Sequence, residues 1–206
     1  MTDTGKLCLE AMNALGWPYA SPGSNNEKGI DCSGLLVYAA ARQRVSLPHG
    51  SNSLWRKSLM EKGRLESTAP LQCGMAVFRH REGTPKKFRD SEGDFYHVGL
   101  VVSEHPLRIL HASSVSGKVV LTASRRGWSH WGMLKNARRI TLIPGMKGED
   151  VRLLQQRLIQ SGHSLKADGI YGPKTKAAVT AFQQNSGLAA DGIAGEKTRK
   201  RLACTP

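Results

Sequence analysis

The chain has 206 residues, 39% of them hydrophobic and 22% charged, a composition that fits a folded globular protein and excludes a disordered or low-complexity chain. Its 30 basic and 16 acidic side chains give a formal net charge of +14, which favours attraction to polyanions without choosing among nucleic acid, anionic lipid and bacterial wall polymers. The four cysteines match no metal-ligand spacing and are too few for the disulfide framework of a small secreted domain, so we predict a chain made in a reducing cytosol.

The N-terminal segment lacks the features of a secretory signal. Asp3, Lys6 and Glu10 interrupt the first 17 residues, which contain no continuous apolar core. No apolar run approaches the length of about 18 residues that a transmembrane helix needs. We therefore expect synthesis in the cytoplasm without a signal peptide, and no membrane span. Any target outside the cell would be reached through lysis or through a route that the sequence does not encode.

Helices are expected first in the chain and strands afterwards. Amphipathic residues 7–15 precede a loop rich in Pro, Gly, Ser and Asn at 18–29, and a helix is expected from Asp31 and Cys32 to about Arg44. Short apolar segments that are typical of strands follow at 75–78, 96–102, 108–112 and 137–143. This order predicts an α+β fold for the larger part of the chain.

A domain boundary is expected where the last apolar run ends in Pro144 and Gly145. Beyond it, apolar residues recur at helical spacing behind two acidic residues that favour a helix start: Val151, Leu154 and Leu158 after Glu149 and Asp150. We therefore predict one domain at 1–143 and a second at 144–206.

The C-terminal segment contains an internal repeat. The pattern Leu-x-Ala-Asp-Gly-Ile-x-Gly-x-Lys-Thr at 165–175 recurs at 188–198. Asp-Gly favours a turn, and Gly172-Pro173 places proline at the first position of the helix that follows. Each copy therefore predicts a turn leading into a helix, and together with the helix before them the two copies predict a small all-α three-helix domain.

Cys32 stands at the N-terminus of the helix that is predicted to begin at residues 31–32. Unpaired backbone N–H groups and the positive end of the helix dipole stabilise a thiolate there, and they lower its pKa below the usual ~8.5. This position suits a nucleophilic cysteine. The alternative is a small buried side chain without a chemical role.

His97 and His111 each lie inside a predicted strand, and residues 103–106 between them have turn character. If the turn centres on Glu104, the two histidines face each other on one side of a hairpin. One imidazole could then take the proton of a thiol while the other orients the first through its second ring nitrogen. The alternative is two histidines on a solvated sheet face.

Four motifs resemble those of NlpC-type cell-wall endopeptidases and stand in the same order: Gly16-Trp17-Pro18-Tyr19, Asp31-Cys32-Ser33-Gly34-Leu35, His97-Val98-Gly99-Leu100 and Leu110-His111-Ala112-Ser113. The resemblance covers roughly 10–143 and implies a minimal papain-like fold, with helices packed on an antiparallel sheet. It implies Cys32 as nucleophile, His97 as general base and His111 as the orienting third member.

The resemblance also implies roles for three neighbours of the nucleophile. The Tyr19 hydroxyl is expected near the oxyanion site, and Asp31 and Ser33 are expected to line the substrate cleft. For Asp31 the alternative is a helix cap alone.

The chain departs from the family pattern in two places. It has Gly74-Met75 where the family usually has Gly-Asp, and the connection from Arg79 to Phe95 is much longer than usual. We expect the inserted residues 80–94 to form a polar surface loop at the cleft edge that affects substrate preference. The remaining histidines match no family position and are expected to be surface or structural residues: His49, His80, His105, His130 and His163.

The C-terminal domain resembles the peptidoglycan-binding domain common on cell-wall hydrolases. The resemblance rests on Gly148-x-x-Val151-x-x-Leu154-Gln155-x-x-Leu158 and on the segment from Asp168 to Thr175. Asp168, Tyr171 and Asp191 are the candidate wall contacts. The alternative for the two Asp-Gly pairs is a purely structural turn.

The two resemblances together imply a bacterial cell-wall hydrolase. Cys32 would attack a stem-peptide amide, with the D-γ-glutamyl–diamino acid bond as the expected target, and water would resolve the thioester. No metal or organic cofactor is needed. Two alternatives stay open: acyl transfer or amidase chemistry on the same residues, and a non-catalytic wall-binding protein.

Nucleic acid is not an expected partner, because the chain has neither zinc-finger spacing nor an RNA-recognition signature and its basic residues are spread over both domains. Peptidoglycan is the expected partner. The missing signal peptide together with a wall-binding tail resembles a phage or prophage endolysin that a holin pore releases. A bacterial hydrolase with unusual export is the alternative.

Overall fold

The computed structural model describes residues 1–23 and 25–203, so Cys204 lies outside the described residues. The chain divides into two compact units. The first consists of Met1–Val102 and Arg108–Arg138, and the second consists of Ser103–Leu107 and the chain from Arg139 onward. Among the described residues, no helix is long and apolar enough to cross a membrane.

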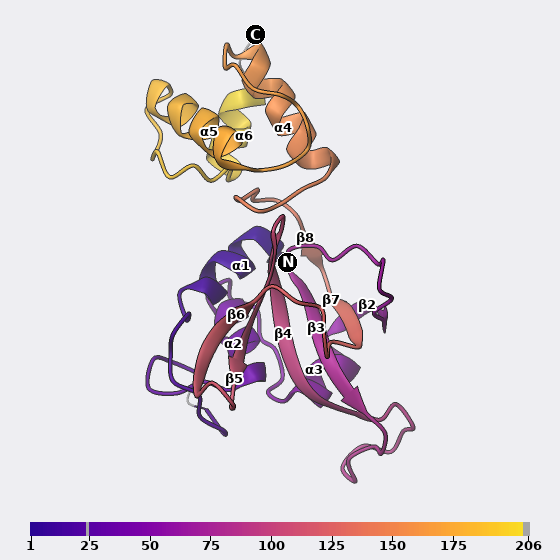
Figure 1. Cartoon of the computed structure of the whole chain (residues 1–206). Coiled ribbons are helices and arrows are strands. Elements are labelled where there is room, and N and C mark those ends of the chain that lie inside the picture. Colours follow the sequence, from indigo (N-terminus) through magenta and orange to yellow (C-terminus); the bar gives the residue numbers. More distant parts are fainter. Residues whose placement is uncertain (24, 204–206) are drawn as a thin grey trace. The chain divides into compact units, whose positions relative to one another are not determined.

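Three helices belong to the first unit: α1 (Thr4–Met12), α2 (Cys32–Ala41) and α3 (Ser51–Lys57) (Figure 1). Helix α1 begins earlier than the amphipathic pattern predicts, because the Asp3 side chain accepts a hydrogen bond from Gly5 N at 3.0 Å and caps the first turn. Helix α2 packs against α1 and buries apolar side chains along its length, namely Leu35, Leu36, Ala39 and Ala40.

The same unit contains a six-stranded sheet with the order β2-β7-β3-β4-β5-β6 (Figure 1). Its strands are β2 (Leu59–Arg64), β3 (Met75–Arg81), β4 (Asp94–Glu104), β5 (Leu107–Ser113), β6 (Lys118–Thr122) and β7 (His130–Leu134). The pairs β2·β7, β3·β7, β3·β4 and β5·β6 are antiparallel. Helices together with an antiparallel sheet confirm the α+β prediction.

Three of the four predicted strands are present as β3, β4 and β5, and each is longer than expected. The fourth prediction, 137–143, is wrong beyond Arg138, because only β8 (Ala137–Arg138) is a strand there and pairs with β1 (Thr2–Asp3). The apolar residues that suggested a strand are buried in the second unit instead: Leu142 is 1% exposed and bridges to Ala194.

The turn between β4 and β5 consists of His105 and Pro106 and therefore lies later than the assumed centre at Glu104. Strand β4 is buried over most of its length, and Val98 and Leu100 are fully buried. An alternation of apolar and polar residues could not predict this burial, because both faces of the strand are covered and apolar residues occur on both.

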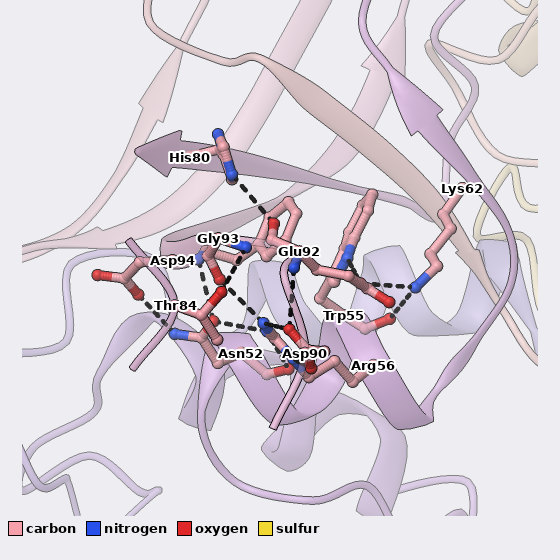
Figure 2. A network of polar contacts seen from close by, with 11 residues as sticks. Asn52, Trp55, Arg56, Lys62, His80, Thr84, Asp90, Glu92, Gly93 and Asp94 are labelled. Atoms are coloured by element: carbon pink, nitrogen blue, oxygen red, sulfur yellow. Dashed lines mark hydrogen bonds and ion pairs between the residues drawn. The ribbon is translucent and has the colours of Figure 1, made fainter. Parts of the chain in front are cut away.

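The insertion between β3 and β4 is shorter than predicted. His80 and Asp94 belong to the two strands, so the loop is 82–93. It does not project freely, because polar contacts attach it to α3 and β2 (Figure 2). The Arg56 guanidinium donates to both oxygens of Asp90 at 2.6 and 2.8 Å, and Lys62 pairs with Glu92 at 3.1 Å.

The second unit contains α4 (Glu149–Gln160), α5 (Pro173–Asn185) and α6 (Glu196–Ala203), the three helices that the repeat predicts. Pro173 is at the first helical position of α5. Apolar side chains from all three helices and the intervening turn form the core, among them Val151, Leu158, Tyr171, Val179 and Leu202.

Each copy of the repeat surrounds one buried glutamine. In the first copy, Gln155 Nε2 donates to Asp168 Oδ1, Ile170 O and Thr175 Oγ1 at 2.8, 3.0 and 2.9 Å. In the second copy, Gln183 Nε2 donates to Asp191 Oδ1, Ile193 O and Thr198 Oγ1 at 2.8, 3.0 and 3.1 Å. In each copy, the repeated Asp, Ile and Thr residues therefore form a polar cluster around the glutamine, and this cluster fixes the turn against the preceding helix.

Replacing Gln183 with Ala should destabilise the second unit by about 2–3 kcal/mol, because the substitution leaves the Gly192 N–H and the Asp191 and Thr198 side chains without their buried partner. Amide exchange at Gly192 and denaturant unfolding of the full chain measure the effect. Gln184→Ala, at an exposed position of the same helix, is the matched control and should change stability by less than about 0.5 kcal/mol. Equal stability of the two variants would contradict a structural role for the cluster.

Candidate active site

The start of α2 is held by Asp31. Its backbone is extended, and its Oδ1 accepts hydrogen bonds from the Ser33 and Gly34 amides at 2.9 and 2.8 Å, which makes Cys32 the first helical residue. Oδ2 of the same carboxylate lies 3.0 Å from His49 Nε2. Asp31 is 5% exposed, so its oxygens serve these contacts and it acts as a cap, the alternative that the sequence left open.

The Ser33 side chain is also buried and hydrogen-bonded within the protein. Its hydroxyl donates to Asp31 Oδ1 at 2.8 Å and accepts from the Gly50 amide at 3.0 Å. The side chain is 3% exposed. The expectation that Ser33 lines the cleft does not fit this geometry, because the hydroxyl instead ties the start of α2 to the residue before α3.

Cys32 is partly buried, and its pKa is raised to about 11. Burial is the largest cause, and the negative charge of Asp31 adds to it. Peptide groups of Val98, Ser33 and Cys32 itself oppose the rise. The expectation of a lowered pKa at the helix N-terminus is therefore wrong, because desolvation outweighs the helix amides.

His97 on β4 and His111 on β5 come together as the sequence predicts. His97 Nε2 lies 3.0 Å from His111 Nδ1, and the two rings are nearly perpendicular at 87°. This hydrogen bond occupies Nε2 of His97 and leaves its Nδ1 as the nitrogen that can take a proton from a nucleophile. Within the described part of the chain, His111 Nε2 is buried without a hydrogen-bond partner.

Both imidazoles are neutral at neutral pH. Burial lowers the pKa of His97 to about 3, with further lowering by His111 and Arg79. Burial likewise lowers the pKa of His111 to about 4, and Arg79 contributes again. With these pKa shifts, Cys32 is a thiol and His97 a neutral base at neutral pH, so we expect the proton to leave Cys32 as the nucleophile attacks.

Trp128 contributes a wall of the site that the sequence analysis missed. Its ring stacks on His97 at 5.5 Å and 20° and meets His111 edge-on at 5.4 Å and 83°. A Cβ at position 99 would lie 2.8 Å from the Trp128 ring, which explains the glycine in the motif His97-Val98-Gly99. In the sequence, the only indication of this role was that Trp128 is an aromatic residue shortly before β7.

Tyr19 and His49 lie on the two chain segments next to the nucleophile. Tyr19 forms a parallel bridge with Ile30, two residues before Cys32, so its backbone borders the approach to α2. The role of its hydroxyl stays a prediction. His49 contacts Asp31, which the sequence analysis did not anticipate, because nothing in the pattern brings residues 31 and 49 together.

The other histidines lie outside this constellation. His80 and His130 pack around Phe95 at ring distances of 4.8 and 5.2 Å, and burial lowers the pKa of His130 to about 4. His163 faces Phe182 at 6.3 Å. Among residues 1–23 and 25–203, no group of three or more His, Cys, Asp or Glu side chains is placed to hold a metal ion.

The three candidate wall contacts of the second unit have different surroundings. Tyr171 is 1% exposed and its hydroxyl donates to Gly192 O at 2.9 Å, so it packs inside the unit and does not fit a contact role. Asp168 and Asp191 are exposed, although one oxygen of each is engaged by a glutamine of the polar clusters.

A groove of about 1000 Å³ lies beside Asp168 in the second unit. Small and apolar residues of α5 form one part of its lining, and polar residues of the preceding turn form another. Its lining includes Ala177, Ala178 and Ala181 together with His163, Lys166, Asp168 and Lys174. A surface with small apolar groups beside charged groups can hold a ligand with both kinds of surface.

Comparison with known families gives two matches. Residues 16–141, more than half of the chain, match the model of the NlpC/P60 family, and residues 147–202 match the PG_binding_1 peptidoglycan binding domain. The chain therefore has the domain make-up of a cell-wall hydrolase. No curated protein sequence matches it.

Several solved structures are similar to parts of the chain. The Burkholderia AP3 phage endolysin is 49% identical over 32% of this chain and 26% of its own length, with a TM-score of 0.32. The NlpC/p60 domain of the peptidoglycan hydrolase SagA is 18% identical over 64% of this chain and 98% of its own length, with a TM-score of 0.48. RipB from Mycobacterium tuberculosis is 22% identical over 64% of this chain and 65% of its own length, with a TM-score of 0.46. The chain thus spans about a quarter of the endolysin.

Alkylation of Cys32 by iodoacetamide should accelerate about tenfold per pH unit from pH 7 to about 10, because a thiol with a pKa of about 11 is almost fully protonated in that range. Mass spectrometry of the labelled peptide measures the rate. Cys8 and Cys73 are 0% and 1% exposed and should stay unlabelled, and Cys204→Ser removes the remaining thiol. A rate that levels off below pH 8 would show a thiolate–imidazolium pair instead.

Proposed function

Because the chain belongs to the NlpC/P60 family, we propose that it is a cysteine endopeptidase that cuts the stem peptides of bacterial peptidoglycan. The hydrogen-bonded pair of His97 and His111 carries this proposal. The Val98 peptide group that lowers the pKa of Cys32 directly follows His97, so the thiol lies beside the strand that carries the base. A thiol beside a base that a third residue orients is the arrangement that acyl transfer requires, and this supports the proposed roles of Cys32, His97 and His111.

In the proposed reaction, Cys32 Sγ attacks the scissile carbonyl while its proton moves to His97 Nδ1. The imidazolium returns this proton to the leaving amine, which departs and leaves a thioester on Cys32. Water then attacks the thioester carbonyl and gives one proton to His97, which returns it to sulfur as the C–S bond breaks. The acid product leaves and ionises to the carboxylate in solvent. His111 keeps the His97 ring oriented throughout and stabilises its charged form through the hydrogen bond to Nε2.

The D-γ-glutamyl–diamino acid bond is the proposed target, as the resemblance to NlpC-type enzymes implies. The Cys32 amide at the start of α2 and the Tyr19 hydroxyl are the proposed oxyanion donors. The chemistry needs no metal and no organic cofactor. We propose a phage or prophage endolysin as the biological setting. The chain joins a hydrolase domain to a wall-binding domain, and its overall net charge of +14 suits attachment to an anionic wall.

In the proposed division of labour, the N-terminal domain, predicted as 1–143, catalyses and the C-terminal domain, predicted as 144–206, binds the wall, although the compact unit that contains the wall-binding domain already begins at Arg139. We propose the groove beside Asp168 as the wall-binding surface. Its alanines can receive the apolar faces of sugars or peptide side chains, while Lys166 and Lys174 offer charge to carboxylates at the rim. Asp168 keeps its proposed contact role there, and Asp191 has its equivalent place in the second repeat.

Cys32→Ala should lower the release of new amino groups from purified sacculi at least about 1000-fold while the fold is retained, because no other nucleophile is proposed. Derivatisation of the released amines followed by mass spectrometry identifies the bond. The triple variant of Cys8, Cys73 and Cys204 is the control and should keep most of its turnover. Activity that survives in Cys32→Ala would refute the mechanism, and consumption of an added amine without release would indicate acyl transfer.

Filling the groove should separate binding from catalysis. Ala177→Trp places a large side chain on an exposed position of the lining and should weaken sedimentation with sacculi about tenfold, while cleavage of soluble stem peptides stays within about twofold. Gln184→Trp, also exposed on α5, is the matched control. The comparison belongs at about 0.5 M salt, where screening suppresses non-specific attraction. Unchanged sedimentation of Ala177→Trp would exclude the groove.

A further inference from the structure

Arg79 lies beside the histidine pair without being part of it. On the β3·β4 ladder it is the direct partner of His97, so both side chains project on the same face of the sheet. Its guanidinium carbon is 5.1 Å from the centroid of Trp128, the ring that stacks on His97. One tryptophan therefore contacts both the proposed base and a fixed cation.

The Arg79 guanidinium has no acidic partner among the described residues. Arg56, Arg81 and Arg139 each pair with a carboxylate within 4.0 Å, whereas Arg79 forms no such pair in residues 1–23 and 25–203. Its Nε is buried and makes no hydrogen bond there. Buried polar groups are normally paired, and the contact with Trp128 accounts for the position of the guanidinium but leaves the buried Nε–H without an acceptor among the described residues.

The charge of Arg79 disfavours protonation of the nearby histidines. It contributes to the lowered pKa of both His97 and His111, which makes the proposed base weaker. A negative group placed on the guanidinium would oppose this effect and would stabilise the imidazolium that forms during acyl transfer. An anion at this position would therefore favour the proposed reaction.

We propose that Arg79, held against Trp128, binds a free carboxylate of the stem peptide next to the cleaved bond. This inference rests on the proposed function. A γ-linked glutamate keeps its α-carboxylate three carbons from the scissile carbonyl, and a diamino acid can carry a second free carboxylate on the other side. The planar guanidinium fork suits a carboxylate in two-point contact, and such a contact would also position the scissile carbonyl over Cys32.

The test uses three synthetic stem peptides that are identical except for one group: both carboxylates free, the glutamate carboxylate amidated, or the distal diamino-acid carboxylate amidated. The full-length protein should prefer the free acid to one of the amides, which identifies the bound group. Arg79→Gln should lower kcat/KM on the free acid about 10- to 100-fold and leave the disfavoured amide within about threefold. Arg79→Lys, which keeps the charge but not the fork, should be intermediate.

Lys57→Gln removes the same charge from an exposed position at the end of α3 and should match the unmodified protein on all three peptides. Equal losses of Arg79→Gln on every peptide, or no loss, would overturn the proposal. If the unmodified protein cleaves none of them, the proposed function fails. Calorimetric binding to Cys32→Ala then decides the inference: a preference for the free acid that Arg79→Gln abolishes supports it, and equal binding refutes it.

Discussion

The candidate site depends on one buried carboxylate. Asp31 Oδ1 accepts from two amides and one hydroxyl at the start of α2, and through Ser33 the contact extends to Gly50, the residue before α3. The same negative charge contributes to the raised pKa of Cys32. The group that fixes the position of the nucleophile therefore disfavours its ionised form, and that opposition explains why a base is needed beside it.

The base in turn depends on packing. Trp128 covers His97 and His111, and it can approach them because position 99 has no side chain. This dry environment keeps both imidazoles neutral, which preserves the lone pair that accepts the thiol proton. Burial thus has opposite consequences for reactivity: it makes Cys32 a poor acid and His97 a poor base, while it strengthens every hydrogen bond and charge contact that a substrate brings into the site.

Local patterns predicted the parts of the structure that depend on neighbouring residues in the chain. Asp31 as a cap, the helix behind Cys32 and the turns of the repeat all arise within a few residues, and the two histidines came together because a hairpin is also local. The prediction failed where distant residues decide. Leu142 is buried by Ala194, His49 meets Asp31, and the desolvation of Cys32 comes from the surrounding fold, so no short pattern contains this information.

The insertion between β3 and β4 connects the two strands that carry residues of the site. Residues 82–93 join β3, which carries Arg79, to β4, which carries His97, and Arg56 of α3 holds the middle of the loop through Asp90. Asn52, in the first turn of α3, donates to Asp94 at the start of β4 (Figure 2). Gly50 directly precedes α3, so its contact with Ser33 and the contact of Asn52 with Asp94 connect the nucleophile's helix, through the start of α3, to the strand of the base. The charged contacts of the loop hold it to α3, the helix that links these two elements, and catalytic geometry generally depends on such support from surrounding residues.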